Sequence, residues 1–316
     1  MAGGDFRADP RLPAVILDHR EPGTALAAFR VAVGVGVLCA LVPTATTGVF
    51  DVVWTDAGYR NVSEAHWVFR IADAWTLTLC GIVTGAMLVV GLGGRLTALV
   101  CLQVLIGLFS INPESGGGHD RLLTNALWLV VLGATTRTLS IDCRLRTGAW
   151  TSADPVAAWP RWLAVYQLVL VYFTTGLQKI GADWWPWGDW SALWYALQIP
   201  HWARGDFRWL AHVYPLTQLA TATTMVFELG SPLLILAFWY RDTRERPGRL
   251  RALCNRIDAR QVFAGVGLGL HLGIVLTMEL GPFSVVSAAF YLCLWSPDEY
   301  QRLIDTLAAR LGSGSA

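Results

Sequence analysis

Lys179 is the only lysine among the 24 basic side chains of this sequence, and the others are arginines. It ends an apolar run and opens a tryptophan-rich stretch, in the order YFTTGLQKIGADWWPWGDW over residues 172–190. A desolvated lysine can lose its proton and act as a base, whereas arginine cannot. An interfacial lysine that extends toward lipid headgroups is the alternative interpretation. Arginine would extend toward headgroups equally well. The presence of lysine at this one position therefore favours a role as a base, and the interfacial role stays an alternative.

Counting back from Lys179 at helical spacing gives Gly176, Thr175 and Tyr172, which form one small and polar stripe on an aliphatic helix. Arg161 marks the other end of the same apolar run. Lys179 follows Arg161 by eighteen positions, a rise of roughly 27 Å in a helix, which places Lys179 near one edge of the hydrocarbon layer.

The tryptophans that follow Lys179 are dense enough to suggest a binding surface. An aromatic belt at the membrane interface explains some of them. Five in eleven positions exceed what a belt requires, so we expect some to line a pocket for a flat ring. They are Trp184, Trp185, Trp187, Trp190 and Trp194.

Two histidines and one arginine are further candidates. His119 follows a glycine run that starts after Ser115 and could bind a polar ligand or relay a proton, or could be an ordinary loop histidine. His271 lies in an apolar run, where a packing role is the common outcome. Arg30 lies inside the first apolar run, and an intramembrane charge is a functional candidate by default. It could also extend toward the inner headgroups. We expect it to form a structural ion pair with a carboxylate such as Glu228.

The composition indicates a polytopic membrane protein. Hydrophobic residues make up 54% of the chain and charged residues 15%, against about a quarter charged in soluble domains. We predict an all-α bundle of about eight transmembrane helices, because helices satisfy their backbone groups in lipid. The last segment is short, and whether it spans is left open. The segments are 24–43, 74–92, 95–111, 122–139, 162–180, 216–239, 261–280 and 283–296.

The distribution of arginine predicts the orientation. With both termini in the cytoplasm, 17 of the 24 basic residues fall in inner segments. The predicted organisation is a polar cytoplasmic tail over 1–23, a transmembrane domain over 24–303 and a short cytoplasmic tail over 304–316. Lys179 and His119 then face the outer side. No Cys/His spacing resembles a metal site, so we expect no metal. No Walker loop is present. We also expect no nucleic-acid partner.

Several motifs together resemble the HTTM domain, the transmembrane domain of vitamin K-dependent gamma-carboxylase and of many bacterial membrane proteins. The likeness runs through residues 25–303. Its strongest mark is the run from Tyr172 through Gly176 and Lys179 to Ala182-Asp183-Trp184. The other marks are Phe29-Arg30 with Gly34, the turn Gly91–Arg95, His119, His271 with Phe283-Ser284, and Ser296-Pro297-Asp298.

The resemblance implies quinone-linked chemistry at the outer face of a bacterial plasma membrane. In the carboxylase, the lysine matching Lys179 deprotonates vitamin K hydroquinone, which then reacts with O2, and the resulting base allows CO2 to add to a peptide glutamate. The histidine matching His119 supports that step. We therefore expect Lys179 and His119 to be catalytic and a reduced naphthoquinone (vitamin K or menaquinol) as cofactor. We expect Tyr172, Thr175, Trp184 and His271 to contact it, and Arg30, Glu228 and Asp183 to be structural.

Departures from the carboxylase pattern keep a second hypothesis open. We expect no counterpart of the large strand-rich lumenal portion of the carboxylase in residues 1–316, and Gly181 stands where the family usually has an acid. Single-domain relatives include a bacterial protein needed to mature the sporulation-delaying toxin. The first hypothesis is a quinol-linked enzyme, a lyase-like relative of the carboxylase that modifies a peptide or small substrate. The second is a non-catalytic membrane scaffold for maturation or export of a secreted peptide.

Overall fold

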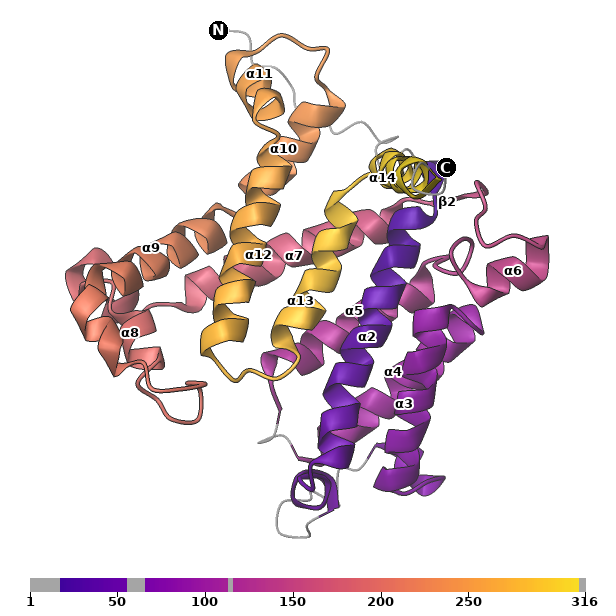
Figure 1. Ribbon diagram of the computed structural model, residues 1–316, viewed down its shortest axis with the longest axis horizontal. Coiled ribbons are helices and arrows are strands. Elements are labelled where there is room, and N and C mark those ends of the chain that lie inside the picture. Colours follow the sequence, from indigo (N-terminus) through magenta and orange to yellow (C-terminus); the bar gives the residue numbers. More distant parts are fainter. Residues whose placement is uncertain (1–17, 56–65, 113–115, 313–316) are drawn as a thin grey trace, which may run out of the picture. The chain divides into compact units, whose positions relative to one another are not determined.

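The computed structural model describes residues 18–55, 66–112 and 116–312, and it is predominantly helical, as the sequence predicted (Figure 1). Most of the predicted polar tail over 1–23 and Ser115, which precedes the glycine run before His119, lie outside these ranges. The chain divides into two compact units, each described below by itself. The first contains residues up to 116, 123–164 and 295 onward, and the second contains residues 117–122 and 165–294.

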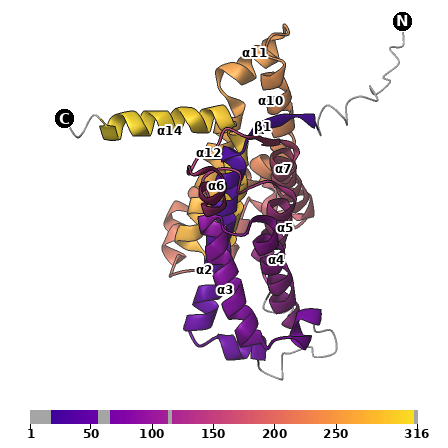
Figure 2. The ribbon, with the colours of Figure 1, turned by 90° about the vertical axis from the view of Figure 1, so that its right-hand side faces the viewer.

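The first unit is a helical bundle in which α3 packs beside both α2 and α4 (Figures 1 and 2). A short two-stranded antiparallel sheet and two short helical turns, Asp51–Thr55 and Trp67–Arg70, complete it. Its elements are β1 (Arg20–Pro22), α2 (Thr24–Thr46), α3 (Ala74–Val90), α4 (Gly94–Ile111), most of α5 (Gly118–Leu132), α6 (Ile141–Thr147), β2 (Pro155–Ala157) and α14 (Pro297–Gly312).

The predicted turn between the second and third apolar segments is confirmed. α3 begins at the N-cap Asp73, whose carboxylate accepts a hydrogen bond from the Thr76 amide at 2.9 Å. It ends at Gly91, whose φ of 71° is favourable only for glycine. Gly85 on α3 lets this helix pack closely against α2, because a Cβ on Gly85 would lie 2.8 Å from the Val37 side chain.

The expected ion pair between Arg30 and Glu228 is wrong. Arg30 is fully buried and donates hydrogen bonds to three backbone carbonyls, those of Leu88 (2.9 Å), Thr135 (2.7 Å) and Leu139 (2.7 Å). The first carbonyl belongs to the last turn of α3, where helical partners run out. The other two follow α5, which ends at Leu132 rather than at the predicted residue 139. Arg30 therefore satisfies backbone carbonyls inside the first unit and does not pair with Glu228.

The small sheet is a feature that the all-α prediction did not include. β1 and β2 each have three residues, and Glu21 on β1 pairs with Val156 on β2. The Glu21 carboxylate also accepts two hydrogen bonds from Arg161 at the start of α7 (Trp159–Gln178), at 2.6 and 2.8 Å. Both side chains are buried, so this bidentate pair fixes the entry of α7.

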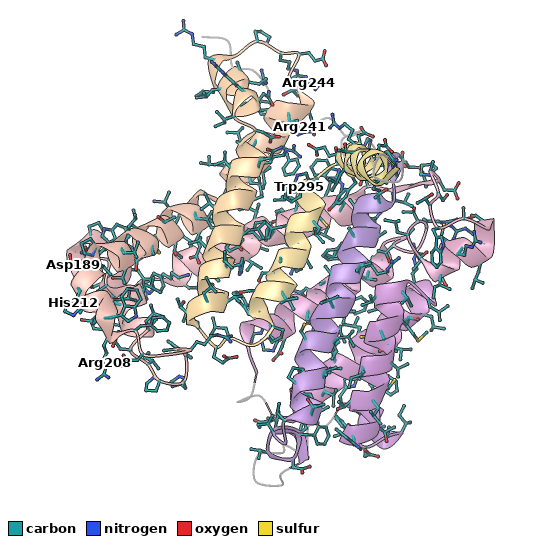
Figure 3. The ribbon with its side chains drawn as sticks, viewed as in Figure 1. Asp189, Arg208, His212, Arg241, Arg244 and Trp295 are labelled. Atoms are coloured by element: carbon teal, nitrogen blue, oxygen red, sulfur yellow. The ribbon has the colours of Figure 1, made fainter. Side chains whose placement is uncertain are left out.

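The second unit carries the predicted lysine site and is built from short turns and longer helices. Asp189, Arg208 and His212 lie near the start of α9, and Arg241 and Arg244 lie where α10 ends (Figure 3). Its elements are most of α7 (Trp159–Gln178), the 3-10 turns Ala182–Trp184 and Pro186–Gly188, α8 (Ala192–Ala196), the 3-10 helix Arg208–Val213, α9 (Tyr214–Gly230), α10 (Leu233–Asp242), α11 (Arg249–Arg256), α12 (Ala259–Thr277), α13 (Phe283–Tyr291) and the 3-10 turn Leu292–Leu294.

The sixth apolar segment is not one straight helix. It breaks between Gly230 and Leu233, and the two parts meet at a bend of 55°. Pro232 explains the break, because proline lacks the N–H that a continuous helix requires and its ring clashes with the preceding turn. The Ser231 hydroxyl at the break donates to the Val169 carbonyl of α7 at 3.1 Å, so the bend is supported by its neighbour.

Three helices among the described residues are long and apolar enough to cross a membrane, and a fourth span is added if the bent pair counts as one. They are α2, α4 and α12, with the bent pair running from Arg208 to Asp242. α3 and the α13 segment are apolar but shorter. The apolar helices thus support a membrane protein, while the eight spans and the cytoplasmic termini stay predictions.

Candidate functional site

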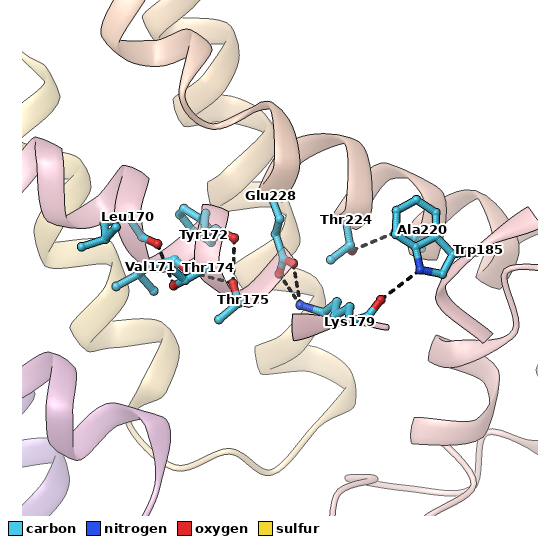
Figure 4. Close-up of polar contacts among 10 residues, drawn as sticks. All are labelled: Leu170, Val171, Tyr172, Thr174, Thr175, Lys179, Trp185, Ala220, Thr224 and Glu228. Carbon is cyan, nitrogen blue, oxygen red and sulfur yellow. Dashed lines mark hydrogen bonds and ion pairs between the residues drawn. The ribbon is translucent and has the colours of Figure 1, made fainter. Parts of the chain in front are cut away.

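Lys179 lies directly after the last residue of α7, and its position is set by close packing of α7 against α9 (Figure 4). The Lys179 amide donates to the Gly176 carbonyl at 3.3 Å, a tight bond to the third residue before it that holds Lys179 against the end of α7. A Cβ on Gly176 would lie 3.1 Å from the Glu228 Cβ, closer than most side chains tolerate. The glycine in the motif therefore lets α9 approach α7 at this level and brings Glu228 to Lys179.

The Lys179 ammonium forms an ion pair with Glu228. Its Nζ atom lies 2.7 Å from Oε1 and 2.5 Å from Oε2 of the carboxylate. Only 19% of the lysine side chain and 10% of the glutamate side chain are exposed. The Trp184 ring covers the ammonium at 4.8 Å from its centroid, within the range of a cation–π contact. The site thus combines a proton donor, a proton acceptor and an aromatic face.

The Trp-rich turn is attached to this ion pair through the backbone. The Trp185 indole donates to the Lys179 carbonyl at 3.0 Å, and its ring stacks on Trp187 with centroids 5.2 Å apart. Asp189 and Trp190 both have positive φ, at 63° and 52°. This conformation is unusual for a bulky residue and is retained only where the surroundings impose it. The turn is therefore a fixed platform for the indoles.

Asp183 and Thr175 have local hydrogen-bonding roles. The Asp183 carboxylate accepts from the Ser191 hydroxyl at 3.0 Å and so ties the two ends of the Trp-rich turn together. The Thr175 hydroxyl donates back to the Val171 carbonyl at 2.8 Å, within its own helix.

Tyr172 and His271, two predicted cofactor contacts, bind each other. The Tyr172 hydroxyl lies 2.7 Å from His271 Nε2 and 2.7 Å from the Tyr291 hydroxyl. His271 Nδ1 lies 3.3 Å from Ser284 Oγ. His271, Tyr291 and Ser284 are buried, so this is an internal polar network between α7, α12 and α13.

A small apolar pocket opens beside Tyr172. Its cavity volume is about 20 Å³, which is room for about one water molecule. Its lining is formed by Leu122, Gln167, Leu168, Val171, Tyr172, Phe283, Ser287 and Phe290. A bicyclic ring does not fit this pocket as it stands.

His119 has a separate environment at the start of α5. Its Nε2 atom lies 3.1 Å from Asp120 Oδ1, and Asp120 also accepts a hydrogen bond from the Gly117 amide at 2.9 Å. Burial lowers the pKa of the His119 imidazole and raises the pKa of the Asp120 carboxyl. The described contacts of His119 do not include Lys179, whose ammonium is held by Glu228 and Trp184.

Comparison with protein families identifies the chain. The model of the HTTM domain matches residues 19–245, which is more than half of the sequence. The chain belongs to the HTTM-domain family. Searches of curated proteins and of solved structures each returned no match. The family relates the chain to the membrane domain of vitamin K-dependent carboxylase, and the matched range contains His119, Lys179 and Glu228.

Sequence reasoning missed the partners of the predicted residues. Glu228 is the only Asp, Glu, Lys or Arg between Trp209 and Tyr240. This isolation identified Glu228 as a candidate, but it did not indicate which cation the carboxylate pairs with. Tyr291 stands in the last apolar segment with no motif around it. Its role emerges only from the packing of α13 against α12.

Proposed function

We propose that this HTTM-domain protein is a membrane enzyme whose Lys179–Glu228 pair works with a reduced naphthoquinone at the outer face of a bacterial plasma membrane. The substrate class is a peptide or a small molecule. The observation that carries the proposal is the pairing of the only lysine of the chain with the only charge of the sixth apolar segment, under an indole ring.

The residues around Lys179 fit the polar end of a hydroquinone. Nζ can donate to a hydroxyl oxygen, Glu228 can accept from a hydroxyl, and the Trp184 face lies beside both. The pocket next to Tyr172 is too small for the ring system, so the Tyr172–His271 network is not where the proposal places it. When bound, the reduced quinone would supply an acidic hydroxyl and two electrons for reaction with O2.

The pair offers a defined place for one proton. Transfer of a proton from Lys179 Nζ to Glu228 leaves a neutral amine and a neutral carboxyl, and the amine can then accept a proton from a ligand hydroxyl. The net result is one additional proton on the pair and an ammonium beside the oxygen that lost it. Low exposure of both side chains strengthens this electrostatic stabilisation.

A scaffold for maturation or export of a peptide is the second candidate, and exposed aromatic side chains favour it. Trp187 is 73% exposed and Trp209 is 56% exposed. Large exposed apolar groups of this kind often mark interaction surfaces. In that case the ion pair would have a structural role alone.

Binding of menaquinol to the purified protein in detergent separates the two candidates. We compare the wild type with Lys179→Ala, Glu228→Gln and His119→Ala, and use Arg204→Gln as the control because that arginine lies in an exposed pair with Glu279. The proposal expects saturable binding that Lys179→Ala and Glu228→Gln weaken and the control does not.

Turnover is tested with Lys179→Arg, which keeps the positive charge but cannot release its proton. Quinol oxidation is followed together with uptake of O2 and CO2. If Lys179→Arg still binds quinol but no longer oxidises it, the result supports Lys179 as the base. If intact wild-type protein binds no quinol, the quinol-enzyme hypothesis is rejected and the scaffold hypothesis remains.

A further inference from the structure

The connection between α10 and α12 carries the strongest concentration of positive charge in the chain. Residues 241–260 contain seven arginines and three acids. One of these acids, Asp258, forms ion pairs through Oδ2 with the guanidinium groups of Arg260 at 3.0 Å and Arg241 at 3.5 Å. Because α10 ends one part of the bent candidate span and α12 is itself a candidate span, this connection emerges at a membrane face.

One side of α11 is anchored to the end of α10. The Arg251 guanidinium lies 5.1 Å from the ring centroids of both Trp239 and Tyr240, and it donates to the Pro247 carbonyl at 2.9 Å. Asn255 donates to the Tyr240 carbonyl at 2.9 Å. Tryptophan and tyrosine are typical of the interface between hydrocarbon and headgroups, so this anchor holds α11 at that depth.

The opposite side of α11 is apolar, exposed and flanked by arginines. Leu250, Leu253 and Ile257 are 67%, 53% and 52% exposed, and their spacing places them in one stripe. Arg249 and Arg256 are also exposed, stand two helical turns apart on one edge of that stripe, and have no ion pair among the described residues.

We propose that α11 is a binding site for anionic phospholipid headgroups, in which Arg249 and Arg256 bind the phosphate and the apolar stripe enters the acyl boundary. The charge favours an anionic ligand. The apolar stripe beside it favours a lipid rather than a soluble anion, and short amphipathic helices with basic flanks bind membrane interfaces in this way. The site is independent of the chemistry at Lys179.

Native mass spectrometry of the full chain in nonionic detergent tests this site. Phosphatidylglycerol and phosphatidylcholine are titrated into wild type and Arg249→Gln/Arg256→Gln. Each basic residue near a lipid surface contributes about fivefold in affinity, so the double variant should bind phosphatidylglycerol about 25-fold more weakly. Binding of phosphatidylcholine, which has the same phosphate but no net charge, should weaken less than binding of phosphatidylglycerol. The fold should not change, because both arginines are exposed.

The matched control is Arg204→Gln/Arg208→Gln, which removes two exposed arginines that lie outside α11 and should leave phosphatidylglycerol binding unchanged. Leu253→Ser/Ile257→Ser should weaken binding of both lipids. Equal phosphatidylglycerol affinity in the wild type and in Arg249→Gln/Arg256→Gln would overturn the proposal. Effective competition by glycerol phosphate would also overturn it, because the ligand would then be a soluble anion.

Discussion

Removing one partner of the Lys179–Glu228 pair should destabilise the protein more than removing both. Lys179→Met breaks contacts of 2.7 and 2.5 Å and leaves a carboxylate that is only 10% exposed without its cation. Breaking a buried pair in this way costs about 3–5 kcal/mol, whereas replacing both partners with apolar residues is often nearly neutral. We therefore expect about 3 kcal/mol for Lys179→Met and for Glu228→Leu, and about 1 kcal/mol for the double variant.

The free energy of unfolding is measured by denaturant titration in detergent micelles, with tryptophan fluorescence as the signal. Arg204→Met is the control, because the Arg204–Glu279 pair is 48% and 59% exposed, and solvent screening limits its contribution to about 1 kcal/mol or less. Costs for both single variants as small as that of the control would refute the reasoning, since the pair would then be solvated.

Three further predictions follow from packing and hydrogen bonds. Arg30→Lys should lower the free energy of unfolding by about 2–4 kcal/mol, because an ammonium cannot reproduce the planar contacts to three carbonyls; a change below about 0.5 kcal/mol would contradict this role. Tyr291→Phe should cost about 1 kcal/mol by removing the hydroxyl bound to Tyr172; unchanged thermal stability would show that the bond is not formed. Gly176→Ala should cost about 1–3 kcal/mol, because the new methyl group crowds Glu228 at 3.1 Å, and a stabilised variant in a thermal unfolding assay would refute the close approach.

The helices that were predicted best are those whose apolar runs end at strong signals. α2, α4 and α12 begin or end within a few residues of their predicted limits. Gly91 and Gly281 both have positive φ and lie in turns, which a glycine between two apolar runs predicts from the local sequence alone. The break at Pro232 was missed because the segment is predominantly apolar on both sides of it, although the proline is itself a helix-breaking signal.

Pairings between distant segments were not predictable from one sequence. Lys179 was identified by its rarity, but its partner depends on how α7 and α9 are rotated and how closely Gly176 lets them approach. Arg30 binds backbone carbonyls, which every residue has, so no side-chain pattern could point to them. The quinone and the substrate remain predictions because they rest on family resemblance and not on the contacts of these residues.

The network around Tyr172 has a consequence for the direction of its hydrogen bonds. If Tyr291 donates to Tyr172 and Tyr172 donates to His271 Nε2, every hydroxyl hydrogen of the two tyrosines has an acceptor. His271 is then the tautomer with hydrogen on Nδ1, which faces Ser284, and Ser284 can donate onward to the His271 carbonyl at 3.4 Å. The reverse order leaves the Tyr291 hydrogen without an acceptor in the network. Matching each donor to an acceptor thus assigns one direction, from Tyr291 toward Ser284, to the hydrogen bonds that link α7, α12 and α13.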